Sequence, residues 1–241
     1  MALSPCTKRE PLADYLANRE YVSSSQLRRL ARLGRRESAA PAAVDFDGSR
    51  MGEALHALVL EPEAFASRYR VLDGSVPAKR YGSGIQAMQR TWLDAWQWTA
   101  LNRARAAILA CPQAPLARWL SHGQKELSIY WTDESGRKWK ARPDCFTDEG
   151  VVMELKTTTD CRPEAFARTR ERLAYDVQAA HYVEAVFRLT GRRPLVVYVA
   201  VDFASPCGVW VHELSEAQVR HAAARLEKLK ATFSCATLAR T

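Results

Sequence analysis

Two short segments carry charged residues of the types and spacing that a divalent-cation site needs. The first is Arg142-Pro143-Asp144 and the second is Glu154-Leu155-Lys156. Side chains alternate along a strand, so in an extended segment Glu154 and Lys156 share one face and Leu155 faces the core. Two nearby carboxylates repel each other, and a cation with oxygen ligands relieves that repulsion. A lysine beside such a site can orient water or stabilise charge that builds on a phosphate.

Two turn signals divide the region around these segments into three strands. Residues 126–131 and 137–146 alternate well enough to be strands, and Asp133-Glu134-Ser135-Gly136 between them is typical of a hairpin turn. A second turn, Asp148-Glu149-Gly150, leads into a short apolar strand over 151–155. The pattern therefore predicts an antiparallel three-strand meander.

The meander brings Asp144 beside Glu154 if their strands are hairpin partners. A cross-strand salt bridge at the surface explains the same charges and is worth under about 1 kcal/mol. Glu154, however, follows the apolar run Val151-Val152-Met153 and so approaches the end of a buried strand. Buried acids generally need a reason. The spacing alone leaves a metal site and a salt bridge both open.

Helical periodicity, strand alternation and turn residues predict the remaining elements. In the first half they are a helix over 26–33 capped by serines 23–25, a loop over 37–48, a helix over 51–60 that ends before Pro62, a basic loop over 79–84, and helices over 85–98 and 102–110. Beyond the meander they are one long helix from Pro163 to Gly191, strands over 195–201 and 208–214, and a helix from Ser215 to about Phe233.

This order predicts an α/β fold with a mixed central sheet flanked by helices. The long crossover helix should return the chain so that strand 195–201 runs parallel to strand 151–155. One domain accounts for residues 1–241, with a helical N-terminal part over about 1–122 and the core over about 123–233.

Charge and cysteine content narrow the class of ligand and the compartment. The 35 Lys+Arg exceed the 27 Asp+Glu and give a formal charge of +8. That surplus favours polyanions, because neutralised phosphates release counterions, although a basic soluble surface explains it as well. The six cysteines form no C-x-x-C pair, and the longest strongly apolar run, 195–200, is too short to cross a bilayer. We therefore expect a cytoplasmic protein with free thiols, no secretory signal and no membrane partner.

An ordered set of motifs resembles the PD-(D/E)xK nuclease superfamily, and more narrowly its RecE-type (exonuclease VIII) and λ-exonuclease recombination enzymes. In chain order the motifs are Gly52-Glu53-Ala54-Leu55-His56 with Leu60-Glu61-Pro62, Glu126 at the start of Glu-Leu-Ser-Ile-Tyr-Trp, Arg142-Pro143-Asp144, Glu154-Leu155-Lys156-Thr157-Thr158, and Gln178-x-x-x-Tyr182. The resemblance covers about 21–233. RecE-type proteins commonly carry aspartate at the position of Glu154, where glutamate is the λ-type choice, and either acid suits a hard cation.

The resemblance implies a role for each of these residues. The implied ligands of Mg²⁺, for which Mn²⁺ can substitute, are His56, Asp144, Glu154 and the backbone carbonyl of Leu155. Lys156 would position the attacking water, and Glu126 would hold a second ion or a water bound to the first. The residues implied to brace the site or to contact DNA are Gln178, Tyr182, Arg142, Ser25 and Arg28.

The resemblance further implies a Mg²⁺-dependent exodeoxyribonuclease that digests linear double-stranded DNA from 5′ ends and leaves 3′ tails for phage-type recombination. The implied partners are duplex DNA ends, further copies of the chain in a ring of three or four subunits, and a single-strand-annealing protein in a bacterial or phage-encoded setting. Two alternatives remain open. One is a RecB-like single-strand or structure-specific endonuclease, and the other is a catalytically silent DNA-binding module of the same fold.

Several of these residues also have purely structural explanations. His56 shares its helix with an apolar stripe, where a histidine is often a core or boundary residue, and Glu126 is equally well a strand-edge acid. Trp92 and Trp96 share a helix face and pack there or stack on bases. The arginines of 28–36 form a solvated helix face or contact phosphates.

Overall fold

The computed structural model of the chain describes residues 4–33, 46–72 and 92–238. Its helices are α1 (Leu12–Ala17), α2 (Ser24–Leu33), α3 (Phe46–Leu60), α4 (Pro62–Arg68), α6 (Ala95–Leu109), α7 (Leu116–His122), α8 (Pro163–Arg172), α9 (Tyr175–Thr190) and α10 (Glu216–Leu238). Its strands are β1 (Cys6–Lys8), β2 (Val22–Ser23), β3 (Arg70–Val71), β4 (Trp92–Leu93), β5 (Gln124–Lys125), β6 (Ser128–Thr132), β7 (Lys138–Ala141), β8 (Cys145–Phe146), β9 (Val151–Thr157), β10 (Leu195–Val201) and β11 (Val209–Glu213). None of these helices is both long enough and apolar enough to span a bilayer.

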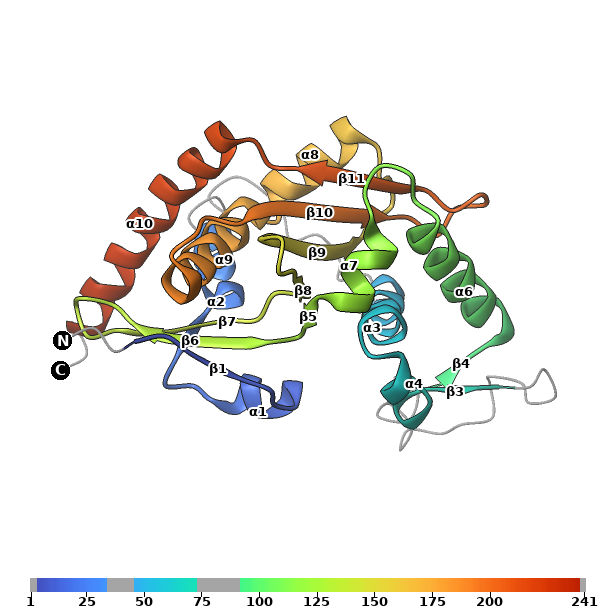
Figure 1. Ribbon diagram of the computed structural model, residues 1–241, viewed down its shortest axis with the longest axis horizontal. Helices are drawn as coiled ribbons and strands as arrows, with labels where there is room; N and C mark the ends of the chain where they lie inside the picture. The colour runs from blue at the N-terminus through green and yellow to red at the C-terminus, as the bar shows by residue number, and fades with distance from the viewer. Residues whose placement is uncertain (1–3, 34–45, 73–91, 239–241) are drawn as a thin grey trace.

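A mixed sheet of order β11-β10-β9-β8-β5 forms the centre of the fold. β9 and β10 are parallel, with Leu195 opposite Val151, and every other neighbouring pair in this sheet is antiparallel. A second sheet of order β1-β6-β7-β2 lies beside it, and the pair β3-β4 stands apart (Figure 1). The predicted mixed α/β fold and the parallel pairing across the crossover are both confirmed.

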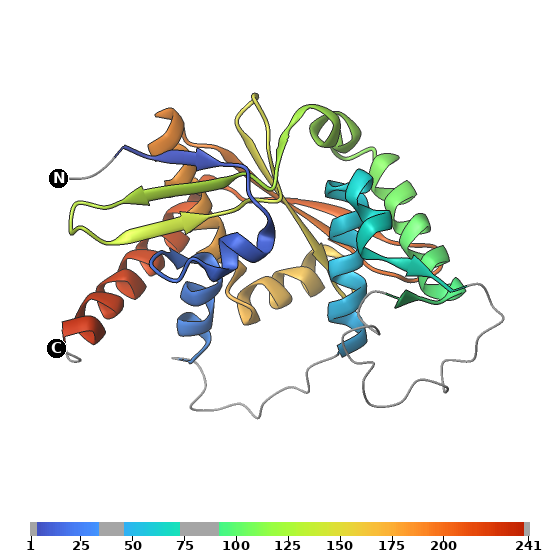
Figure 2. The same ribbon diagram turned by 90° about the horizontal axis from the view of Figure 1, so that it is seen from below.

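The central sheet separates two hydrophobic cores. Even-numbered residues of β9 and β10, such as Val152 and Tyr198, pack with α2, α9 and α10. Odd-numbered residues, such as Met153 and Leu155, pack with α3, α6 and α7. These two groups of helices lie at opposite ends of the molecule in both views (Figures 1 and 2). Because both faces are covered, β9 is apolar until it reaches Glu154.

The predicted meander is wrong in one respect, and the difference creates the site. Residues 137–146 form two strands in two sheets, since β7 pairs with β6 whereas β8 pairs with β9. The chain leaves the first ladder at Arg142-Pro143-Asp144, where Pro143 has no N–H to donate to a partner strand. β6 begins at Ser128 rather than at Glu126, whose φ of 53° lies in the left-handed region. The turn at Asp148-Glu149-Gly150 is present, and Thr147 N–H donates to the Val151 carbonyl at 2.9 Å.

The predicted crossover helix is two helices, α8 and α9. They are separated at Leu173-Ala174, where Ala174 has a left-handed φ of 53° that no continuous α-helix accepts. Gly191, with a φ of 71°, ends α9 as expected. Ser215 precedes α10 and its Oγ accepts from the Gln218 N–H at 3.3 Å, although α10 runs on beyond the predicted end.

The N-terminal part is less uniformly helical than predicted. β1 and β2 extend the second sheet, and α3 begins at Phe46, inside the expected loop over 37–48. Residues 92–93 form β4 instead of helix, and the two helices expected over 85–98 and 102–110 are the single helix α6. Asp94 ends the strand and starts α6 through a capping box with Gln97. The expected loop over 79–84, most of the loop over 37–48 and residues 85–91 lie outside the described residues.

The described cysteines are all free thiols, namely Cys6, Cys111, Cys145, Cys161 and Cys207.

Candidate metal centre and its comparison with known proteins

Asp144 and Glu154 face each other across the first residues of the β8–β9 ladder. Cys145 pairs with Met153, so the residues that precede and follow this pair, Asp144 and Glu154, are direct neighbours. The Asp144 Oδ2 atom accepts from the Leu155 N–H at 2.7 Å, and the Asp144 N–H donates to Glu154 Oε2 at 3.3 Å. Both acids are buried, with 6% and 2% of their surface exposed. They are not a surface salt bridge.

His56 reaches the same strand from α3 on the other side. Its Nε2 atom lies 2.9 Å from the Leu155 carbonyl oxygen, and its Nδ1 atom lies 3.5 Å from Asp144 Oδ2. Gly52, one turn earlier, permits this approach, because a Cβ atom there would meet the Thr157 hydroxyl at 2.8 Å. The Gly-x-x-x-His spacing therefore has a steric reason. The glycine lets α3 pack close to β9, and the histidine one turn later faces the carboxyl end of β9.

Glu126 completes the cluster from the turn between β5 and β6. Its N–H donates to the Asp144 carbonyl at 3.1 Å, which fixes the unusual left-handed backbone next to Asp144. Its Oε2 atom accepts from Arg142 Nε at 2.5 Å. A Nη atom of Arg142 also donates to the Ser128 hydroxyl and to the Glu10 carbonyl. Strained backbone of this kind is concentrated at functional sites.

These residues fit a divalent cation. One ligand atom each from His56, Glu126 and Asp144 lies within 4.8 Å of the other two, and no second group of this kind occurs in the described parts of the chain. Carboxylate oxygens and an imidazole nitrogen suit Mg²⁺ or Mn²⁺. The composition of the set differs from the predicted one, because Glu126 joins it directly. Glu154 lies across from Asp144 and turns toward Lys156, and the Leu155 carbonyl contacts His56.

Lys156 and Gln178 hold Glu154 in place, and Tyr182 contacts Gln178. Lys156 Nζ donates to Glu154 Oε1 at 2.6 Å, and Gln178 Nε2 donates to the same oxygen at 2.7 Å. Gln178 Nε2 also lies 2.9 Å from the Tyr182 hydroxyl, which donates to the Arg142 carbonyl at 3.0 Å. The Gln-x-x-x-Tyr motif thus ties α9 to both charged segments of the centre.

Buried like charges define the electrostatics of this centre. Burial and the adjacent Glu154 carboxylate raise the pKa of Asp144 well above its usual range, and burial and Asp144 raise the pKa of Glu126 to about 7. Burial and the nearby Lys156 lower the pKa of His56. Burial opposes the ammonium of Lys156, but the two carboxylates outweigh it and raise the pKa of Lys156. Neutral imidazole, charged lysine and crowded acids are the state that a bound cation would stabilise.

The residues predicted to contact DNA lie in different settings. Ser25 is exposed on α2, and Arg28 is partly buried there, with its Nε donating to the Leu173 carbonyl at 3.1 Å. Arg142 is 8% exposed and paired with Glu126, a placement that favours a role in positioning that acid. Trp96 is 61% exposed on α6, whereas Trp92 lies in β4. Arg35 and Arg36 lie outside the described residues.

Tyr175 is a neighbour of the centre that the motifs did not single out. Its ring lies 5.0 Å from Lys156 Nζ and 4.5 Å from the Arg28 guanidinium carbon. The signal was available, since Tyr175 precedes Gln178 by three residues and so shares its helix face.

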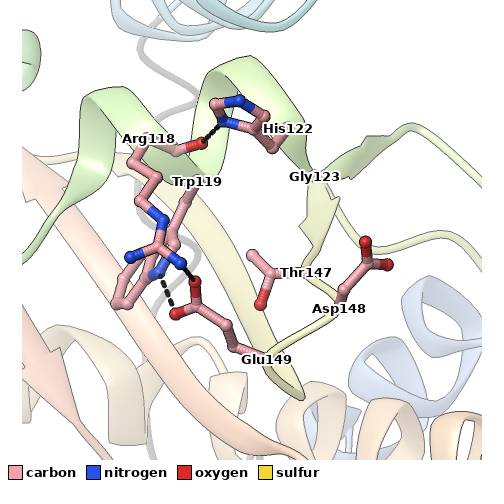
Figure 3. Close-up of a pocket in the computed structure, with 7 residues that line it drawn as sticks. All are labelled: Arg118, Trp119, His122, Gly123, Thr147, Asp148 and Glu149. Atoms are coloured by element: carbon pink, nitrogen blue, oxygen red, sulfur yellow. Dashed lines mark hydrogen bonds and ion pairs between the residues drawn. The ribbon is translucent and has the colours of Figure 1, made fainter.

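A separate cavity of about 340 Å³ lies beside the turn that joins β8 to β9 (Figure 3). Arg118 reaches across it to pair with Glu149, which also accepts from the Trp119 indole N–H at 3.4 Å. Its lining residues are Arg118, Trp119, His122, Gly123, Thr147, Asp148 and Glu149. Because Glu149 lies in the turn before β9 and Lys156 lies near the end of that strand, this cavity is not part of the metal centre.

Comparisons with known proteins agree with this fold. A solved structure from Eubacterium rectale, described as a "Putative exonuclease", superposes with a TM-score of 0.64 at 15% identity over 92% of this chain and 84% of its own. A second, described as SSO0001, gives a TM-score of 0.36 at 12% identity over 90% and 81% of the two chains, which is too low to support an argument. No curated protein matches the chain. Residues 23–237 match the family described as "PDDEXK-like domain of unknown function (DUF3799)". The chain therefore belongs to this family of PDDEXK-like domains.

Proposed function

We propose that this chain is a Mg²⁺-dependent exodeoxyribonuclease that digests linear double-stranded DNA from its 5′ ends and leaves 3′ single-stranded tails. One observation carries the proposal: ligand atoms of His56, Glu126 and Asp144 converge within 4.8 Å, and Lys156 donates a hydrogen bond to the adjacent Glu154 carboxylate. Family membership and the fold shared with a protein described as an exonuclease support hydrolysis of a nucleic acid. The 5′ polarity and the preference for duplex ends rest on the resemblance to RecE-type and λ-type enzymes.

His56, Glu126 and Asp144 would hold the cation, with Glu154 available as a further carboxylate across the ladder. A bound divalent cation supplies Lewis-acid activation of water and charge neutralisation at a phosphate. The ammonium of Lys156, only 13% exposed, is placed to orient the attacking water and to stabilise negative charge on the phosphate. Gln178 keeps the Glu154 carboxylate aligned, because its Nε2 atom donates a hydrogen bond to Glu154 Oε1.

Mg²⁺ is the proposed ion because carboxylate oxygens dominate the cluster. Mn²⁺ is the proposed substitute, since the imidazole of His56 adds a nitrogen ligand that transition metals accept readily.

The proposed setting is phage-type recombination in a bacterial cytoplasm. We infer a ring of three or four copies of the chain around DNA and a single-strand-annealing protein as the partner that coats the 3′ tail. The net charge of +8 supports a polyanionic substrate. Gel filtration with light scattering, with and without duplex DNA, tests the ring: a strictly monomeric chain would remove it from the proposal.

The experiment that tests the activity offers three substrates with Mg²⁺: end-labelled linear duplex, nicked circle and single strand. The proposal predicts that mononucleotides are released from the 5′-labelled strand of linear duplex. It also predicts that the nicked circles are not digested. Cleavage of circles or of single strands with linear duplex spared would instead identify the RecB-like or structure-specific endonuclease. DNA binding without Mg²⁺-dependent cleavage of any substrate would leave only the catalytically silent binding module.

A further inference from the structure

Two cations lie against the ring of one tyrosine next to the metal centre. Lys156 Nζ and the Arg28 guanidinium carbon lie 5.0 Å and 4.5 Å from the centroid of the Tyr175 ring. Both distances are within the range in which a cation is attracted to an aromatic ring. Tyr175 is 8% exposed, so this attraction acts in a partly desolvated place where it is strongest.

The backbone around Tyr175 is fixed from several directions. The left-handed Ala174 separates α8 from α9, which makes Tyr175 the first residue of the helix that carries Gln178. The Tyr198 hydroxyl donates to the Tyr175 carbonyl at 2.6 Å, and Arg28 Nε donates to the Leu173 carbonyl at 3.1 Å. The Tyr175 ring itself stacks on the Tyr198 ring, with 5.8 Å between the centroids, so it offers a fixed platform for flexible side chains.

Lysine and arginine side chains otherwise have considerable rotamer freedom. Lys156 gains one anchor from Glu154 at 2.6 Å and a second from the Tyr175 ring. Within the described residues no carboxylate pairs with Arg28, although its charge lies beside the same ring as Lys156. Two cations that share a platform, one of them without an acidic partner in the described chain, favour an anionic ligand that contacts both.

We propose that Tyr175 is a positioning residue that aligns Lys156 with Arg28, so that the two cations contact neighbouring phosphates of one DNA strand. This inference rests on the proposed nuclease function and adds to it the side chain that positions Lys156. Arg28 then binds the phosphate next to the scissile one, and Lys156 acts at the scissile phosphate itself.

Two variants of Tyr175 separate positioning from packing. Tyr175→Phe keeps the ring, and Tyr175→Leu removes it. Phe166→Leu is the matched control, because the Phe166 ring is fully buried in the same aromatic cluster and contacts Tyr175, Tyr198 and His212. We expect Tyr175→Leu to lower kcat on duplex DNA about tenfold, the factor that a desolvated cation–ring contact supplies. Tyr175→Phe should stay within about twofold of the native chain, since the ring contact remains.

A second measurement does not depend on cleavage. In lysine-labelled protein the ring current of Tyr175 should shift the Lys156 side-chain NMR signals upfield; the signals are assigned by their loss in Lys156→Arg. We expect the shift to persist in Tyr175→Phe and Phe166→Leu and to vanish in Tyr175→Leu. An unchanged shift in Tyr175→Leu, or equal losses of kcat in Tyr175→Leu and Phe166→Leu, would overturn the proposal. A native chain that lacks nuclease activity but shows the predicted shifts would support the positioning and refute the nuclease function instead.

Discussion

The carboxylate of Asp144 accepts a hydrogen bond from the Leu155 N–H at 2.7 Å, while the N–H of Asp144 donates to the Glu154 carboxylate at 3.3 Å. The second of these hydrogen bonds joins two acids that face each other across β8 and β9. The reciprocal arrangement holds two negative groups together in a buried place. Such an arrangement is costly without a cation, and the cost itself is measurable.

Replacing Asp144 with asparagine should stabilise the metal-free protein and abolish its activity. Asparagine keeps an oxygen for the Leu155 N–H but carries no charge, whereas the raised pKa of Asp144 shows that the folded state disfavours its ionised form. We expect Asp144→Asn to raise the free energy of unfolding in EDTA at pH 8 by about 1 kcal/mol or more, one pKa unit being about 1.4 kcal/mol. Asp148→Asn, in the exposed turn of the same hairpin, is the control and should leave stability unchanged. A destabilised Asp144→Asn would contradict this electrostatic account.

Removing the Gln178 amide should weaken metal binding more than folding. Gln178 donates to Glu154 and lies against the Tyr182 hydroxyl, so Gln178→Ala frees the carboxylate to leave its position. We expect the Mg²⁺ concentration for half-maximal activity to rise about tenfold or more, as for other groups that orient metal ligands. Tyr182→Phe keeps the packing and the Gln178–Glu154 contact, so its rise should be smaller. The same Mg²⁺ concentration for half-maximal activity in both variants and the native chain would show that Gln178 does not position Glu154 for metal binding.

Arg142 and Arg28 should differ in what their loss does to DNA binding. Arg28 lies at the α2–α8 junction and is predicted to contact a phosphate, so Arg28→Gln should reduce the slope of log K against log salt by about one. Arg142 is buried against Glu126, so Arg142→Gln should leave that slope unchanged and lower Mg²⁺ affinity. Fluorescence anisotropy of labelled duplex in EDTA measures the slopes. A reduced slope of log K against log salt in Arg142→Gln would show instead that Arg142 contacts DNA.

The stability of the fold should fall in acid because of His181. This residue packs against Trp131 and Trp139, and its Nε2 contacts the Lys140 carbonyl at 2.9 Å. Burial lowers the pKa of His181 to about 4, so between that pH and its unfolded pKa near 6.5 only the unfolded chain takes up the proton. Stability is therefore retained above about pH 6.5 and lost as the pH falls toward 4, by up to about 3 kcal/mol.

Urea unfolding at pH 5 and pH 7 tests this linkage. We expect the difference in unfolding free energy between the two pH values to shrink in His181→Gln and to remain in His122→Gln, since His122 is exposed on α7. If His181→Gln keeps the full difference, other groups cause the acid sensitivity.

The sequence predicted the parts of the centre that obey local rules. Alternation along β9 placed Glu154 and Lys156 on one face, and the turn at 148–150 made Asp144 their neighbour. The crossover predicted the parallel β9–β10 pair, because such connections have few alternatives. Gly191 and Ser215 also ended and started their helices as expected.

Tertiary contacts decided what local rules could not. Nothing in the periodicity of 137–146 indicates that Pro143 moves the chain from one sheet to another, and that change gives Glu126 its place beside Asp144. The left-handed Ala174 is likewise invisible to periodicity, because alanine favours helix. By sequence Arg142 matched a pattern of DNA contact. Its burial against Glu126 favours a role in positioning that acid instead.

The most direct test of the central claim is cleavage of end-labelled linear duplex DNA by the native chain and by Asp144→Asn, each with Mg²⁺ and with EDTA. The account predicts rapid loss of the 5′ label for the native chain with Mg²⁺, and none with EDTA or with Asp144→Asn under either condition. Circular dichroism must show both proteins folded. Cleavage that persists in EDTA, or that survives in folded Asp144→Asn, would contradict a metal centre built on His56, Glu126 and Asp144.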